Sequence, residues 1–247
     1  MIPKKIHYCW FGGKPKSRLI KKCIKSWMKF FPSYDIIEWN ESNFDLDSCR
    51  YVREAYKAGK WAFVSDYARY KILYDEGGIY FDTDVEVIKH FDDIISHGAF
   101  FGCENPDTDT PLAVNLGLGC AVEAKNAFYL EMLEQYERTS FYKEDGSLDL
   151  CTIVERTTER LKKYGLENKN EIQFVAGIRV YPSEYFCPIN MNTGKLEITE
   201  NTHSIHRYAG SWVDPITRFR GKVYFIVVRI FGEERAGRLR TIVGRKN

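Results

Sequence analysis

Residues 60–88, KWAFVSDYARYKILYDEGGIYFDTDVEVI, contain the pattern that decides the fold. Apolar residues recur at helical spacing through residues 60–76, which predicts a helix. Gly77 and Gly78 then end it, because glycine readily takes the left-handed conformation just past a helix. The apolar run over residues 79–88 predicts a buried strand that carries Asp82 and Asp84. A helix that leads directly into a buried strand indicates an α/β domain.

The flanking segments continue this alternation. Residues 4–11 predict a strand, residues 17–31 a helix with Ser17 as its N-cap, and residues 34–39 a second strand. Strand, helix and strand in this order imply parallel pairing. Further along we expect a glycine-rich strand or loop over residues 111–124, helices over 126–139 and 150–165, and an extended segment over 171–182. We therefore expect one α/β domain over residues 1–215 and an appended segment over residues 216–247.

The composition is that of a soluble globular protein, with 44% hydrophobic and 28% charged residues. Its seven cysteines show no C-x-x-C spacing, which favours reduced, buried thiols in a cytosolic protein over a disulfide framework. The first residues lack the apolar core of a signal peptide, and no apolar run is long enough to span a bilayer. These features predict a cytoplasmic location.

Positive charge is concentrated at the C-terminal end, where residues 218–247 hold nine Lys or Arg and two Glu. One interpretation is a final strand and a solvated helix that complete the domain. The other is a peripheral anchor at the inner face of the plasma membrane, because basic residues bind anionic lipid. Nucleic acid is disfavoured, since no recognisable reading motif accompanies the basic cluster.

Asp82 and Asp84 are the first candidate site. Alternate residues of a strand point to the same side, so the two carboxylates are expected to project together. Such a pair repels itself unless a proton or a cation intervenes, and Mg²⁺ or Mn²⁺ joins carboxylates to substrate phosphates in many enzymes. The alternative is an edge strand that becomes polar where it meets solvent.

Two further features could belong to the same site. Asp66 and Arg69 share one helix face with Ala62 and Leu73, so they form either a surface ion pair or a contact for a hydroxyl-rich ligand. Trp10 stands at the carboxyl end of the first strand, where open sheets bind ligands. It is either a core tryptophan or a platform on which a nucleobase stacks.

Together these stretches resemble bacterial members of glycosyltransferase family 32, the DXD-containing group related to the glucosylating domains of large clostridial toxins. The matching segments are IPKKIHYCWFGG (2–13), WAFVSDYARYKILYDEGGIYFDTDVEV (61–87) and HSIHRYAGSW (203–212). The resemblance implies a GT-A fold, a Rossmann-like, mixed but mainly parallel sheet flanked by helices. It also implies a nucleotide-sugar donor, most often UDP-linked, with Mn²⁺ or Mg²⁺ and transfer with retention of anomeric configuration. Members of this type build capsule or O-antigen polysaccharide on saccharide or lipid-linked acceptors.

The resemblance also implies residue roles. Asp84 and His206 would be metal ligands, and Asp82 would contact ribose, sugar or a metal-bound water. Trp10 would stack on the base, and Asp66 with Arg69 would hold the donor sugar. Ser211 and Trp212 would close over the pyrophosphate. The toxin branch has a carboxylate where His206 stands, and His203 is a rival for its role.

The residues leave several alternatives open. Asn115 either reaches the donor or acceptor or stabilises a turn. No covalent nucleophile can be named, and front-face transfer fits the sequence at least as well as double displacement. Asp82, Asp84 and Arg69 would then act by orienting the sugar and stabilising the leaving diphosphate. A non-catalytic nucleotide-sugar-binding protein on the same scaffold is the main alternative function. A D-x-D phosphatase is disfavoured, because Glu86 stands where such enzymes have Thr or Val.

Overall fold

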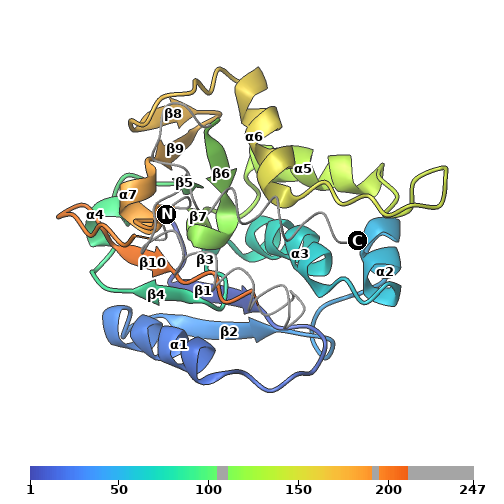
Figure 1. The fold of residues 1–247 in the computed structure, drawn as a ribbon, viewed down its shortest axis with the longest axis horizontal. Coiled ribbons are helices and arrows are strands. Elements are labelled where there is room, and N and C mark those ends of the chain that lie inside the picture. Colours follow the sequence, from blue (N-terminus) through green and yellow to red (C-terminus); the bar gives the residue numbers. More distant parts are fainter. Residues whose placement is uncertain (105–110, 191–194, 211–247) are drawn as a thin grey trace, which may run out of the picture.

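The computed structural model describes residues 1–104, 111–190 and 195–210. Within these residues the chain folds around one large sheet and a small two-stranded sheet (Figure 1). The strands are β1 Lys5–Cys9, β2 Asp35–Trp39, β3 Gly78–Tyr80, β4 Val85–Val87, β5 Phe100–Glu104, β6 Ala113–Asn115, β7 Cys120–Val122, β8 Gln173–Val175, β9 Ile178–Tyr181 and β10 Ser204–His206. The helices are α1 Arg18–Phe30, α2 Arg50–Lys57, α3 Trp61–Glu76, α4 Asp92–Ile95, α5 Ala127–Glu137, α6 Ile153–Lys163 and α7 Ser183–Phe186, with a 3-10 turn η1 at Leu116–Leu118.

The large sheet is mixed. Its strand order is β2-β1-β3-β7-β5-β9-β8, and β6 pairs with β5 beside this path. Parallel pairs join β1 to β2, β1 to β3 and β5 to β9, whereas β6, β7 and β8 pair antiparallel to their neighbours. The expected parallel unit β1-α1-β2 is therefore present.

Alternating strand residues build one apolar core on each face of this sheet. Tyr80 and Phe101 face α2, α3, α5 and α6, whereas the preceding residues Ile79 and Phe100 face α1, α4 and α7. The small sheet of β4 and β10 belongs to the second core, through Val85 and Val87 of β4. Helices thus cover both faces, and the expected α/β fold, with a mixed sheet flanked by helices, is confirmed (Figure 1).

Local sequence signals explain most element boundaries. Ser17 caps α1 by accepting a hydrogen bond from the Ile20 N–H, as expected. Gly77 ends α3 with a φ of 63°, which glycine adopts without steric cost. A β-carbon at Gly77 would also lie 2.7 Å from the Ala124 backbone nitrogen, so the tight exit into β3 requires glycine.

The expected strand over residues 79–88 is wrong in one respect. It is interrupted after Tyr80, so that β3 joins the large sheet and β4 joins the small one. Residues 81–84 connect the two as a turn, closed by a hydrogen bond from the Val85 N–H to the Asp82 carbonyl, 3.0 Å. The expected glycine-rich segment becomes β6, η1 and β7, and the expected extended segment becomes the hairpin of β8 and β9.

The seven cysteines are all free, and each is buried except the half-buried Cys151. Across the described part of the chain, no helix has the length and apolar character needed to span a membrane. The appended segment expected at residues 216–247 lies outside the described residues.

Candidate functional site

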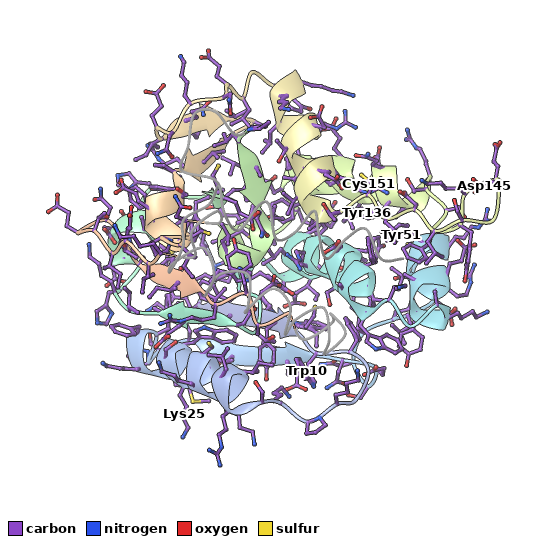
Figure 2. All side chains as sticks on the ribbon, in the orientation of Figure 1. Trp10, Lys25, Tyr51, Tyr136, Asp145 and Cys151 are labelled. Atoms are coloured by element: carbon purple, nitrogen blue, oxygen red, sulfur yellow. The ribbon has the colours of Figure 1, made fainter. Side chains whose placement is uncertain are left out.

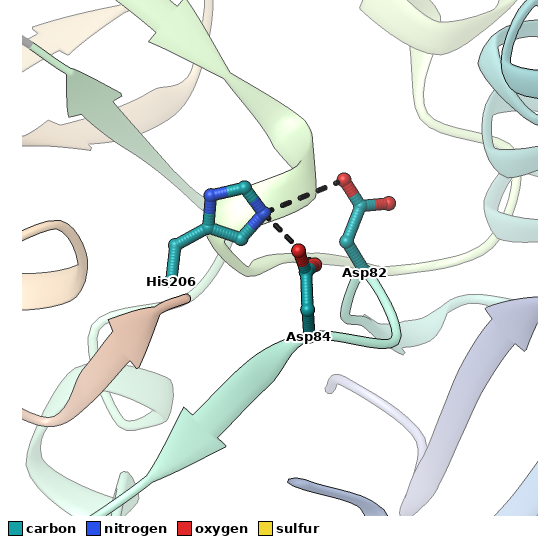
Figure 3. Close-up of side chains that lie close together, drawn as sticks. All are labelled: Asp82, Asp84 and His206. Atoms are coloured by element: carbon teal, nitrogen blue, oxygen red, sulfur yellow. Dashed lines mark ion pairs between the residues drawn. The ribbon is translucent and has the colours of Figure 1, made fainter. Parts of the chain in front are cut away.

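Three side chains converge where the two sheets meet. Asp82 and Asp84 project from the turn between β3 and β4, and His206 ends β10 (Figure 3). The His206 Nε2 lies 3.1 Å from an Asp84 oxygen and 4.0 Å from an Asp82 oxygen. One ligand atom from each residue falls within 4.8 Å of the others, which makes this group a candidate metal centre.

The turn, and not strand alternation, brings the two aspartates together. Because β3 ends before Asp82, the rule that alternate strand residues share a face does not apply to this pair. The Asp82 N–H donates to the Gly117 carbonyl at 3.0 Å, which ties the start of the turn to η1. The Ala209 N–H donates to Asp84 Oδ2 at 2.7 Å, which ties its end to the segment after β10.

Gly117 closes one wall of the site. A β-carbon on Gly117 would lie 2.0 Å from the carboxylate oxygen Oδ2 of Asp82, so no side chain fits there. Asn115 holds this turn in place, because its Oδ1 accepts from the Gly117 N–H at 2.7 Å. The Asn115 amide also donates to Glu104 at 2.5 Å. Asn115 therefore stabilises a turn, which is one of the two roles that the sequence left open.

The pKa shifts of Asp84 and His206 indicate that negative charge gathers in this cluster. Burial disfavours the charged form of Asp84, but His206 and the Ala209 N–H outweigh it and lower the pKa of this carboxyl. Burial alone would lower the pKa of His206, yet Asp84, Asp82 and Glu104 raise it. The negative charge that raises the pKa of His206 would equally attract a divalent cation to this position.

The donor set also suits such an ion. Two carboxylate oxygens and one imidazole nitrogen match Mn²⁺ well, because Mn²⁺ accepts nitrogen more readily than Mg²⁺ does. The buried Nδ1 of His206 has no hydrogen-bond partner among the described residues. A ligating histidine normally donates this second N–H, so the orientation of the ring leaves one interaction for a water or a ligand.

His203 is not an alternative ligand. Its Nε2 lies 2.9 Å from an Asp93 oxygen, and its Nδ1 lies 2.6 Å from the Asn201 carbonyl. Both ring nitrogens are therefore occupied by contacts away from the aspartate turn, and of the two histidines it is His206 that lies beside Asp82 and Asp84.

Asp66 and Arg69 form a buried pair on α3 and not a surface ion pair. The Arg69 Nη2 lies 3.5 Å from Asp66 Oδ1 and 3.0 Å from Asp82 Oδ1, so it links the helix to the metal candidate. The guanidinium also lies over the Tyr80 ring, 4.7 Å from its centre. Arg69 Nη1 is buried without a partner among the described residues, which leaves one strong donor unused.

The charge balance of this pair depends on burial. Burial raises the pKa of Asp66 to about 6, and the nearby Asp82 adds to the effect, while Arg69 and the Ile153 N–H oppose it. The Ile153 N–H at the start of α6 donates to Asp66 Oδ2 at 3.2 Å. Asp66 therefore changes charge closer to neutral pH than an ordinary aspartate.

Trp10 lies directly after β1 and is half-buried. Its Nε1 donates to the Lys14 carbonyl at 2.6 Å, and the Lys16 ammonium lies 5.5 Å from the ring centre. The tryptophan is thus fixed in place without being enclosed in the core. Ser211 and Trp212 lie outside the described residues.

The structure adds residues that the sequence did not single out. Glu104 accepts hydrogen bonds from Asn115 and from the Tyr208 hydroxyl, the latter at 2.9 Å. The Tyr208 ring meets His206 edge to face, with ring centres 4.2 Å apart. Gly117 could have been noticed in the stretch AVNLGLGC, but its role depends on a contact with a distant turn.

Comparisons with solved structures return glycosyltransferases. The "PaToxG Glycosyltransferase" structure shares 22% identity at a TM-score of 0.44, over 54% of this chain and 59% of that chain. The second is a glycosyltransferase involved in the glycosylation of the major capsid of PBCV-1, with 11% identity and a TM-score of 0.47, over 90% of this chain and 98% of that chain. Among curated proteins there is no significant match.

A family model places the site in a recognised sequence context. The matched segment begins at the N-cap of α1 and ends within β5, so it includes Asp66, Arg69, Asp82 and Asp84. Residues 17–101 match the family described as "Glycosyltransferase sugar-binding region containing DXD motif".

Proposed function

We propose that this protein is a retaining, metal-dependent glycosyltransferase that moves a sugar from a nucleotide-sugar donor, UDP-linked, to a saccharide or lipid-linked saccharide acceptor in surface polysaccharide synthesis. The observation that carries the proposal is the Asp82–Asp84–His206 group, with its ligand atoms within 4.8 Å of one another. The family match over residues 17–101 supports the same reading.

Asp84 and His206 would hold Mn²⁺ or Mg²⁺ directly, and Asp82 would hold it through its own oxygen or through a bound water. When bound, the ion supplies positive charge that stabilises a departing diphosphate. Arg69 would contribute further positive charge through its unused Nη1, because a preorganised cation in a buried site stabilises developing negative charge strongly.

The remaining residues would bind and orient the donor. Asp66, fixed by Arg69 and the α6 N-terminus, can accept hydrogen bonds from sugar hydroxyls. Trp10 offers an indole face to a nucleobase, and Ser211 with Trp212 would close over the diphosphate. A fixed sugar needs less reorganisation on the way to the transition state. No side chain is assigned as a covalent nucleophile, and we favour front-face transfer.

We also propose that the protein attaches to the membrane, and the reason is the lipid-linked acceptor. A lipid-linked acceptor would place the enzyme in the cytoplasm at the inner face of the membrane. The basic residues of segment 216–247 would attract anionic lipid.

The test is nucleotide release from a panel of UDP-sugars, and from GDP-mannose, with Mn²⁺, Mg²⁺ or a chelator. We expect metal-dependent release by the native protein. Asp84→Asn should lose it while keeping the native melting temperature, since the substitution preserves size. A folded Asp84→Asn protein with near-native turnover in saturating Mn²⁺ would refute the assigned metal ligand. Binding of a UDP-sugar without any release of UDP would instead indicate a non-catalytic binder.

A further inference from the structure

We propose that the outer face of α1 is a docking surface for the anionic surface of a lipid bilayer. The helix Arg18–Phe30 contains five basic residues and no acidic one. All five basic side chains are exposed, at Arg18, Lys21, Lys22, Lys25 and Lys29. We call this set the α1 basic stripe.

The stripe is confined to one side of the helix. With 3.6 residues per turn, these positions fall within about a third of the helix circumference. The opposite side holds the buried Ile20, Cys23 and Trp27, which pack toward the sheet. Lys25 points away from the body of the molecule, and α1 lies at its outer edge (Figures 1 and 2). A straight helix of 13 residues is about 20 Å long, so the stripe presents a continuous charged edge.

Most of this charge is not neutralised by the residues that the structure describes. Lys22 forms an ion pair with Glu86 at 2.7 Å. Arg18, Lys21, Lys25 and Lys29 form none with any residue that the structure describes. Elsewhere on the described surface, lysines such as Lys71 and Lys125 have acidic partners, and those without one, such as Lys57 and Lys143, lie in segments that also hold acidic residues. The stripe therefore differs from an ordinary solvated face, where charges of both signs alternate.

An exposed apolar side chain favours a lipid bilayer over a nucleic acid as the partner. Met28, which is 57% exposed, lies at the edge of the stripe between Lys25 and Lys29 in sequence. A flexible thioether gains by entering the boundary between headgroups and acyl chains, while lysine stems lie along the surface with their ammonium groups in water. The phosphate backbone of a nucleic acid offers such a side chain no comparable environment.

The proposed surface is joined to the candidate site by the segment that leads into α1. The Lys14 carbonyl accepts a hydrogen bond from the Trp10 indole N–H, and the Lys16 ammonium lies over the Trp10 ring. Docking through α1 would hold this edge of the site next to the bilayer. The inference needs neither the proposed reaction nor the segment 216–247.

The test is sedimentation of the full chain with phosphatidylcholine vesicles, with and without phosphatidylglycerol. The variant Lys21→Gln/Lys25→Gln/Lys29→Gln removes three stripe charges. The control Lys162→Gln/Lys163→Gln/Lys169→Gln removes the same charge from exposed positions in and after α6. Each basic residue near an anionic surface strengthens binding by roughly fivefold, so we expect the stripe variant to bind at least tenfold more weakly. The control should bind like the native protein.

Added salt should weaken native binding, because it screens exposed charges. Met28→Ser should also weaken binding to anionic vesicles, although this substitution leaves the charge unchanged. Equal losses in the stripe and control variants would overturn the proposal, as would unchanged binding by a stripe variant with a native melting curve. Loss of binding only on truncation after Pro215 would assign the membrane contact to the tail instead. Tighter binding to a DNA duplex than to anionic vesicles at the same salt would assign the stripe to nucleic acid.

Discussion

Substitution of Gly117 by alanine should damage the candidate metal centre without touching any of its ligands. Gly117 lies in η1, and the β-carbon would meet Asp82 Oδ2 at 2.0 Å and Asp82 Cγ at 2.7 Å. The carboxylate must therefore move by about an ångström to restore an ordinary contact. Asp82 cannot withdraw as a whole, because its N–H is bonded to the Gly117 carbonyl.

The size of the effect follows from what the carboxylate loses. Its hydrogen bond with Arg69, now 3.0 Å long, would lengthen beyond useful range, and a hydrogen bond to a charged group contributes about 1.5–3 kcal/mol. Overpacking of a well-filled site costs a similar amount, about 1–3 kcal/mol. We expect Gly117→Ala to lower the free energy of unfolding by about 2 kcal/mol. Mn²⁺ affinity should fall by about tenfold, as when a residue that supports metal ligands is changed.

Urea unfolding with and without Mn²⁺ measures both effects. At a Mn²⁺ concentration of about 100 times the native dissociation constant, binding adds about 2.7 kcal/mol to the native protein. A tenfold weaker site gains only about 1.4 kcal/mol under the same conditions. Gly102→Ala is the matched control, because its β-carbon would meet the Phe186 ring at 2.6 Å, in the core. It should lose stability yet keep the full gain from Mn²⁺. An equal Mn²⁺ gain in Gly117→Ala and the native protein would refute the reasoning.

Three further predictions follow from the same contacts. His206→Gln should abolish Mn²⁺ stabilisation whereas His203→Gln should retain it, measured by thermal melting, because only His206 faces the aspartate turn. Arg69→Lys should reduce nucleotide release at least tenfold in a steady-state assay, since an ammonium can neither stack on Tyr80 nor donate to Ser65 and Asp82 from separate nitrogens as the guanidinium does. Burial lowers the pKa of His7 from 6.5 to about 4, so the unfolded state binds more protons between these values and stability is lost as pH falls through them. His7→Gln should therefore remove about 3 kcal/mol of pH dependence over that window in denaturant titrations, and an unaltered slope would contradict this.

Much of the architecture follows from local signals in the sequence. The helix α3, its glycine exit and the parallel unit β1-α1-β2 all appear where periodicity and capping residues indicate them. The helix α2 was not predicted, although its buried Tyr51, Val52 and Ala55 show helical spacing. Short antiparallel strands such as β6 and β7 were merged into one segment, because three-residue strands carry too little alternation to be separated from turns.

The predicted proximity of Asp82 and Asp84 is present, but its geometry differs from the prediction. The turn after β3 brings the two aspartates together. Apolar residues stand on both sides of this turn, so the sequence pattern predicts one continuous strand and not a turn. The burial of Asp66 and Arg69 could not be read from a helix that mixes charged and apolar residues around its circumference. The contact between Gly117 and Asp82 joins residues far apart in sequence, so no local pattern could reveal it.

The interruption after β3 places the two aspartates of the candidate metal centre on different supports. Asp82 is held from the large sheet by Gly117 and Arg69, whereas Asp84 is held from the small sheet by Ala209 and faces His206 on β10. The two carboxylates are therefore positioned from different parts of the fold. In the proposed enzyme a cation between them would offset the repulsion of the two carboxylates, which His206 faces in the described structure. Metal affinity should therefore depend on contacts from both sides, and a change on either side, such as Gly117→Ala, should weaken it.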